Sequence, residues 1–297
     1  MANSIALAEK FQPILDEIYK YSSLTASMDA KTKPVSFTNA QTVKVFQIDM
    51  VGMGDYSRAT GFPAGDVTGI WVDLTLTKDR GRAFSIDAMD DEETIGMAFG
   101  KLVGEFMRTK VVPEIDAYRF HTYSSWTDIQ SPSPAALSTS SAVLDAFDVA
   151  MQALDAQEVP REGRKLFTSE SIYHLLKGSL TRTWKSEGAV SREVESIDNV
   201  DVTMVPQTRF YKGIDLDDGS ESNAGGYSKT ASTGRDINFM LLHPSALLQV
   251  AKHNPLRVFP PAVNQTADAW LFQYRIYHDC FVYDNKVKGV YAHIKNA

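Results

Sequence analysis

The sequence has little cysteine, few histidines and no long apolar run. Its single cysteine, Cys280, excludes an intrachain disulfide framework and any metal site built from several cysteines. The six histidines are scattered without metal-ligand spacing, and there is no G-x-x-x-x-G-K-[ST] phosphate loop. No stretch approaches the roughly 18 consecutive apolar residues of a membrane helix. We therefore expect no membrane segment, no metal and no cofactor.

The chain also lacks an excess of positive charge. It carries 30 basic and 37 acidic residues, a formal net charge of -7. Broad, sequence-independent binding to nucleic acid needs a basic face, so the balance argues against it. An acidic protein can still enclose DNA without binding it tightly. The 297 residues, 43% of them hydrophobic, are enough for one large or two modest domains with a real core.

The first 39 residues have the pattern of an arm. Apolar residues from Ile5 to Ile18 fit one helical face, which Pro13 interrupts. Residues 22–39 are polar and show no sustained period. We expect them to be extended, with little hold on a core.

A long β-hairpin is the clearest feature of the sequence. Residues 43–50 predict one strand, 70–77 a second with clean period-2 alternation, and 82–87 a third. The first connection is rich in glycine and includes Pro63, which excludes regular helix. Such a ribbon is marginal alone in water, so we expect a neighbouring molecule to cover it.

Charged and aromatic residues of this hairpin are candidates for contact between subunits. Three lie at the tip, and three alternate along what the sequence predicts to be one strand face of the hairpin. A solvated edge that discourages aggregation explains the strand residues about equally well. The candidates are Asp55, Tyr56, Arg58, Lys78, Arg80 and Arg82.

A long helix follows the hairpin directly. Asp90 or Asp91 can cap it, and apolar residues recur at helical spacing to about residue 123. Pro113 predicts a kink near Thr109–Pro113. A Ser/Pro-rich stretch at 124–141 then marks a boundary.

Mixed elements fill the rest of the chain, which makes the fold class α+β. The expected elements are a helix at 141–156, a strand at 164–168, a helix from Thr168 to Lys177, a strand at 200–206, a surface loop at 217–236, a strand at 237–242, a helix at 244–253 and a β-rich end with a turn at Asp284–Asn285.

Candidate chemistry is weak throughout. The acidic run at 87–93 fits a capped helix start better than a cation site. Cys280 and His278 lie two apart on a predicted strand and can point the same way, but a cysteine among aromatic residues is usually a small buried hydrophobe. We therefore predict no catalytic residues and no enzyme, and keep a Cys280–His278 hydrolase as the alternative from another class.

The order of these elements resembles the major capsid proteins of tailed bacteriophages, which have the Hong Kong 97-like fold. The residues that carry the resemblance are GDYSRATGFPAGDVTG, LTLTKDRGRAFSIDAMDDEET and AFGKLVGEFMRTKVVPEIDAYRF. It is strongest over 40–120 and softer over 140–235. It implies an N-terminal arm (1–39), an extended E-loop hairpin (40–90), a P-domain with a spine helix (91–135 and 257–297) and an A-domain (136–256).

The resemblance also implies partners. Family members self-assemble through pentamers and hexamers into an icosahedral shell that encloses double-stranded DNA. It implies a virion location, assembly in the host cytoplasm and a portal protein. Because the arm begins almost at Met1, we expect either a separate scaffolding protein or a precursor that was cut, and we favour the separate scaffolding protein. An encapsulin-like nanocompartment of the same fold is the alternative function. Some family members cross-link a lysine to an asparagine, but Lys78 and Asn285 or Asn296 do not match that motif residue by residue, so the resemblance is not extended to a cross-link.

Overall fold

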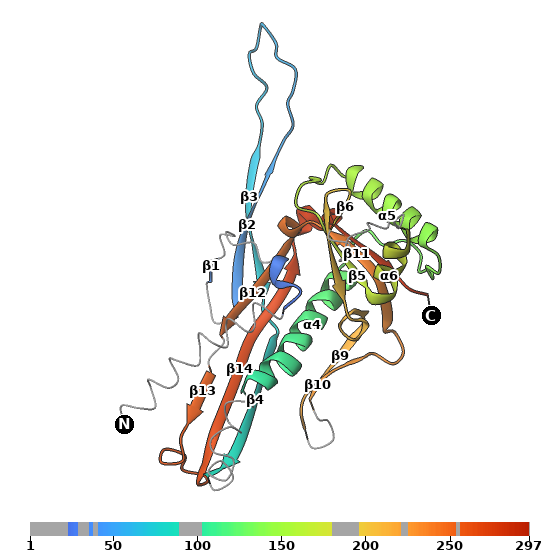
Figure 1. The fold of residues 1–297 in the computed structure, drawn as a ribbon. Coiled ribbons are helices and arrows are strands. Elements are labelled where there is room, and N and C mark those ends of the chain that lie inside the picture. Colours follow the sequence, from blue (N-terminus) through green and yellow to red (C-terminus); the bar gives the residue numbers. More distant parts are fainter. Residues whose placement is uncertain are drawn as a thin grey trace, which may run out of the picture.

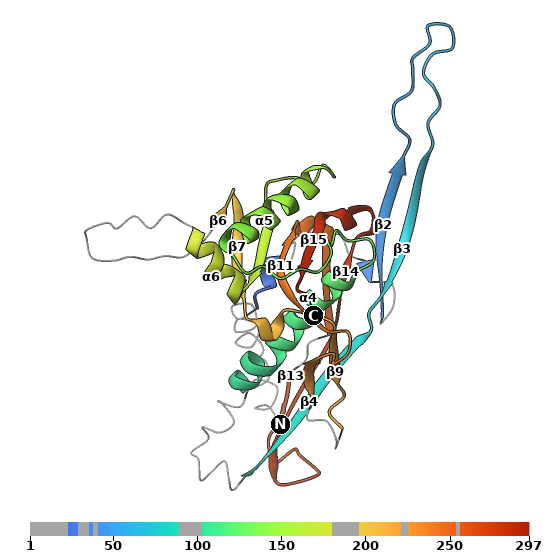
Figure 2. The same cartoon turned by 90° about the vertical axis from the view of Figure 1, so that its right-hand side faces the viewer.

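The computed structural model describes residues 23–28, 36–37, 41–88, 103–179, 196–220, 225–253 and 256–296. Two sheets, one long helical segment and a projecting ribbon organise these residues (Figures 1 and 2). None of the described helices is long and apolar enough to cross a membrane.

The first sheet is built around one long strand, β14 (Ala269–Val282). Strand β4 (Lys78–Asp87) pairs with one edge of β14. Phe272 of β14 shows that this strand has partners on both edges, since it pairs with Phe84 of β4 on one side and with Val258 on the other. The other edge holds β12 (Leu247–His253) and β13 (Leu256–Phe259) in tandem.

The second sheet is sandwiched between helices. Its order is β15-β11-β5-β7-β6, with β8 pairing β11. Phe239 and Leu241 of β11 pack with helix α5, whereas Met240 and Leu242 pack in the cluster that contains Phe120 of helix α4. The elements are α5 (Ser140–Asp155), β5 (Lys165–Ser169), α6 (Glu170–Ser179), β6 (Ser196–Ile197), β7 (Val200–Val205), η3 (Gln207–Arg209), β8 (Tyr211–Lys212), β11 (Arg235–Leu242), η5 (Asp284–Gly289) and β15 (Val290–Ile294). The predicted helices at 141–156 and 168–177, and the strands at 164–168, 200–206 and 237–242, are confirmed to within a few residues.

The long helix is described from Val103 onward and ends with α4 (Val112–Ser125). Its irregularity is a π-helical turn, η2 (Met107–Val111), just before Pro113. Val112 N–H donates to the Met107 carbonyl five residues back. The wider turn accommodates a proline that lacks a donor and would crowd an ordinary α-helical turn. The π turn lies where the sequence predicts a kink, at Thr109–Pro113, and the kink itself stays a prediction. The predicted cap at Asp90 or Asp91 lies outside the described residues.

Two predictions for the second half of the chain are wrong. Residues 244–253 form a 3-10 turn, η4 (Pro244–Ala246), and strand β12 in place of a helix. Pairing with β14 overrides the helical propensity, and the alternation places Leu248 and Val250 against the base of the ribbon. The predicted loop 217–236 contains strand β10 (Gly226–Lys229), which forms a hairpin with β9 (Ile214–Asp217).

The expectation of a loosely held arm is corrected for residues 23–28, which end in η1 (Ala26–Met28). Ser23, Thr25 and Met28 are buried. The buried Asp116 carboxylate of α4 accepts hydrogen bonds from the Ser23 hydroxyl (2.8 Å), the Thr25 hydroxyl (2.7 Å) and the Leu24 amide (3.1 Å). A buried carboxylate needs such partners. The sequence did not single out Asp116, because Glu114 and Arg119 lie in the same helix.

Candidate assembly surface

The ribbon of β2 (Thr42–Met50) and β3 (Val67–Thr75) projects from the body of the molecule (Figures 1 and 2). The two strands pair without interruption from Thr42↔Thr75 to Met50↔Val67, and β1 (Ser36–Phe37) pairs only at the base of β2. This confirms the predicted first two strands.

The ribbon and its tip are lined with exposed apolar side chains. Ten of the thirteen exposed large hydrophobic residues of the described chain lie between Phe46 and Trp71. They are Phe46, Ile48, Met50, Val51, Met53, Tyr56, Phe62, Val67, Ile70 and Trp71. Isolated exposed hydrophobic residues are ordinary, but a concentration of this kind marks an interaction surface.

The tip has a defined structure. Ser57 and Gly61 exchange two backbone hydrogen bonds, of 3.1 and 2.8 Å, around a tight turn in which Gly61 has a φ of 82°. Tyr56 and Phe62 flank this turn with ring centroids 5.0 Å apart, and Phe62 is 87% exposed. Asp55, Tyr56 and Arg58 therefore lie at the tip, as the sequence predicts. Their contact with another subunit stays a prediction.

The other three candidates do not lie on the ribbon. Lys78, Arg80 and Arg82 belong to β4, which pairs with β14. The predicted third strand at 82–87 is thus part of β4 and not of the hairpin. Sequence alternation shows which residues share a strand face, but it does not identify the partner strand. A role of all three in contact between subunits stays a prediction.

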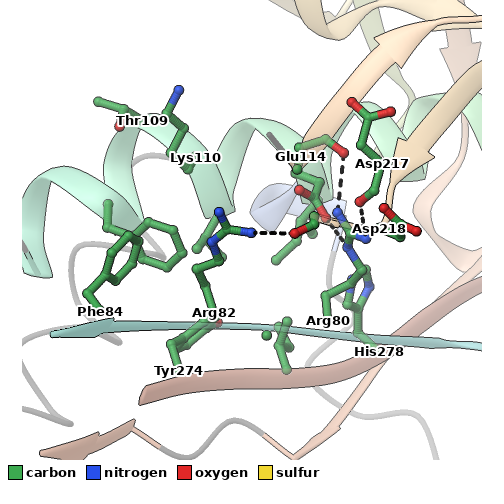
Figure 3. Close-up of a pocket in the computed structure, with 18 of the residues that line it drawn as sticks. Arg80, Arg82, Phe84, Thr109, Lys110, Glu114, Asp217, Asp218, Tyr274 and His278 are labelled. Carbon is green, nitrogen blue, oxygen red and sulfur yellow. Dashed lines mark hydrogen bonds and ion pairs between the residues drawn. The ribbon is translucent and has the colours of Figure 1, made fainter. Parts of the chain in front are cut away.

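Arg80 and Arg82 instead hold the β9–β10 hairpin inside the molecule (Figure 3). Arg80 Nε donates to Glu114 Oε1 at 2.6 Å, and its Nη1 and Nη2 donate to the carbonyls of Asp217 (2.7 Å) and Gly226 (3.2 Å). Arg82 Nη1 donates to the Gly219 carbonyl at 3.4 Å. This network links β4, α4 and β9–β10.

A cavity of about 410 Å³ lies between β4, η2 and the β9–β10 hairpin (Figure 3). Its lining is mostly apolar, with Phe84, Phe106 and Tyr274 among the walls, and Arg80 and Arg82 at one side. Phe84 and Phe106 meet edge to face, with ring centroids 4.9 Å apart. The sequence did not indicate this cavity, because its walls come from four segments that are distant in the sequence: β4, the helix around η2, the β9–β10 hairpin and β14.

The buried Cys280 and His278 lack the properties of a nucleophile and its base. Burial raises the pKa of the Cys280 thiol to about 12, which keeps it protonated near neutral pH. Burial, with Arg119 nearby as a second cause, lowers the pKa of His278 to about 4. His278 packs edge to face on Tyr118, with ring centroids 5.6 Å apart. No group of three or more His, Cys, Asp or Glu residues within the described ranges could hold a metal ion.

Comparison with known proteins identifies the fold. No family model and no curated sequence matches the chain. Among solved structures, the capsid of cyanophage P-SCSP1u aligns with a TM-score of 0.58 and 10% identity over 88% of this chain and 85% of that one. The mature capsid of bacteriophage PhiM1 aligns at 0.56 and 13% identity, covering 90% and 89%.

This chain has the Hong Kong 97-like phage capsid fold. A virus-like particle from Pyrococcus furiosus also aligns, with a TM-score of 0.56 and 13% identity, covering 96% of this chain and 98% of that one. These structures are matched over most of their length, so the likeness extends over most of the chain rather than over one domain. The predicted fold class is confirmed.

Proposed function

We propose that the chain is a major capsid protein that self-assembles through pentamers and hexamers into an icosahedral shell enclosing double-stranded DNA. The observation that carries the proposal is the projecting ribbon, whose apolar side chains are exposed in the single subunit. Burying such a surface requires another molecule. The capsid fold of the chain supports a copy of itself as that molecule.

The proposed parts of the subunit follow the capsid fold. Residues 1–39 serve as the N-terminal arm, 40–90 as the E-loop, 91–135 with 257–297 as the P-domain, and 136–256 as the A-domain. Strand β4 modifies this division, because it belongs by pairing to the sheet of β14. The proposal places the protein in the virion after assembly in the host cytoplasm, with a portal protein and a separate scaffolding protein as partners and no enzymatic activity.

Negative-stain electron microscopy and sedimentation velocity of the purified chain test this function. We expect closed shells or rings of five and six subunits. Monomers alone, at high protein concentration and over a wide range of salt, would contradict it.

An encapsulin-like nanocompartment is the second candidate, since the virus-like particle from Pyrococcus furiosus has the same fold. The two functions differ in what the shell holds. Particles isolated from producing cells are treated with nuclease and then opened. Protected double-stranded DNA supports the capsid function, whereas a protein cargo without DNA supports the nanocompartment.

A further inference from the structure

The two faces of the β2–β3 ribbon have different surroundings along its length. We call the core face the one that carries Val43 and Val45, whose cross-strand partners are Leu74 and Val72. At the base of the ribbon Val43, Val45 and Leu74 pack in one cluster with Leu248, Val250 and Phe281 of the body. The opposite face carries a salt bridge at the same level, from Lys44 Nζ to Asp73 Oδ1 at 3.5 Å.

Beyond Val45 the apolar residues change to the other face. Register pairs Phe46 with Trp71, Ile48 with Gly69 and Met50 with Val67, so these residues share the face opposite the core face. We call this set the distal apolar face. All its large side chains are exposed: Phe46 47%, Ile48 55%, Met50 68%, Val67 68% and Trp71 56%.

The core face becomes mainly polar over the same stretch. Its pairs there are Gln47 with Ile70 and Asp49 with Thr68, and Ile70 is the single large apolar member. A ribbon that only needed solubility would carry polar residues on both faces. The change of face indicates that the distal part is built to contact something other than its own body.

The distal apolar face is preorganised for contact. The rings of Phe46 and Trp71 meet with centroids 5.0 Å apart. Gly69 lets the Phe46 ring lie across the ribbon, because a Cβ there would stand 2.6 Å from Phe46 Cζ. Aromatic side chains already packed in this way lose little conformational freedom when a partner covers them.

We infer that the distal apolar face is seated on a second copy of this chain, while the polar distal part of the core face remains in solvent. This rests on the proposed function and adds which face of the ribbon makes the contact. Every subunit exposes the same apolar surface, so covering all of these surfaces takes one partner molecule per subunit. Other copies of the chain are present in that ratio. The ribbon extends away from its own body (Figure 1), so its distal apolar face is in reach of the body of a neighbouring copy rather than of its own. If the contact is head to tail, as the proposed pentamers and hexamers require, it closes into a ring when the rotation closes.

Cysteine accessibility at two adjacent positions tests the inference in the full chain. Ile48→Cys samples the distal apolar face and Asp49→Cys the opposite face at the same height. The native Cys280 gives little background, because it is 1% exposed and burial raises its pKa to about 12. A maleimide reagent is applied to each variant, both as assembled shells and as subunits dissociated under mild conditions.

We expect assembly to slow labelling of Ile48→Cys by about tenfold or more, since thiol reactivity follows exposure, and to leave Asp49→Cys nearly unchanged. Failure of Ile48→Cys to assemble, with Asp49→Cys assembling normally, would also support the inference. Shells in which both cysteines label equally fast overturn the inference and leave the proposed function standing. A parent chain that never assembles overturns both.

Discussion

The β2–β3 ribbon and strand β11 are both rich in large apolar residues, but the two regions bury them differently. In β11, Phe239 and Met240 lie on opposite faces of a sheet covered by helices on both sides, and each is 1% exposed or less. In the distal ribbon, Phe46 and Ile48 are about half exposed. The body therefore completes its own core, whereas the ribbon contributes apolar surface that the single subunit cannot bury. Stability of the subunit and stability of the assembly should depend on different residues.

Matched Phe→Ala substitutions give the largest test of this difference. Phe239→Ala removes a buried ring from the central sheet and should lower the free energy of unfolding of the subunit by about 3–5 kcal/mol. Phe46→Ala should cost about 1 kcal/mol, mainly the contact with Trp71. Urea unfolding of dissociated subunits measures both. Equal losses would show that the ribbon is part of the folded core of the subunit.

Protonation of histidines below pH 6.5 should act on the body, since no histidine lies between Thr42 and Thr75 of the ribbon. The folded pKa of His278 is about 4, below its ordinary value of 6.5, so the unfolded chain binds more protons between these two pH values. Stability conferred by neutral His278 is therefore present above pH 6.5 and is lost as the pH falls towards 4, by roughly 3 kcal/mol in total.

Urea unfolding of the subunit across this pH range measures the loss. His278→Asn should make the dependence shallower. It should not abolish it, because burial also lowers the pKa of His121 and His293. An unchanged slope in His278→Asn would contradict the assignment.

Arg80→Ala should have an intermediate effect, on the body alone. It removes an ion pair and two hydrogen bonds to main-chain carbonyls and leaves Glu114 without this partner, so we expect a loss of about 1–3 kcal/mol. Arg275→Ala is the matched control, because its ion pair with Asp79 is exposed to solvent and should contribute little to the free energy of unfolding. Amide exchange should also become faster in the β9–β10 hairpin of Arg80→Ala only. Normal protection there would show that Arg80 does not hold the hairpin.

Gly69→Ala should have the smallest effect on the free energy of unfolding of the subunit, but it should clearly weaken assembly. The added methyl displaces the Phe46 ring, which is half exposed and can turn outward, so the cost in unfolding free energy should be below about 1 kcal/mol. The displaced ring no longer lies flat on the distal apolar face. Light scattering should show assembly at a higher protein concentration than for the parent chain. Unchanged assembly would show that the packing of Phe46 against Gly69 does not contribute to the contact between subunits.

Local patterns predicted the elements whose environment follows from their own sequence. Period-2 alternation located β3, and an apolar stripe at helical spacing located α5. The predictions were wrong where contact with a segment distant in the sequence determines the secondary structure or the partners of a residue. Residues 244–253 have good helical propensity, but β14 offers them a strand partner. Lys78, Arg80 and Arg82 alternate correctly along β4, but their contacts come from α4 and the β9–β10 hairpin.

By itself, the sequence determined the α+β class, the glycine-rich hairpin followed by a long helix, and the likeness to phage capsid proteins, because these depend on spacing along the chain. Only the tertiary structure decided that β4 leaves the hairpin to pair with β14, and that Asp116 binds residues 23–25. It also showed that the apolar face of the ribbon changes side at Phe46. Each of these depends on pairing or contact between separate segments, and a one-dimensional pattern carries no information about which segments meet.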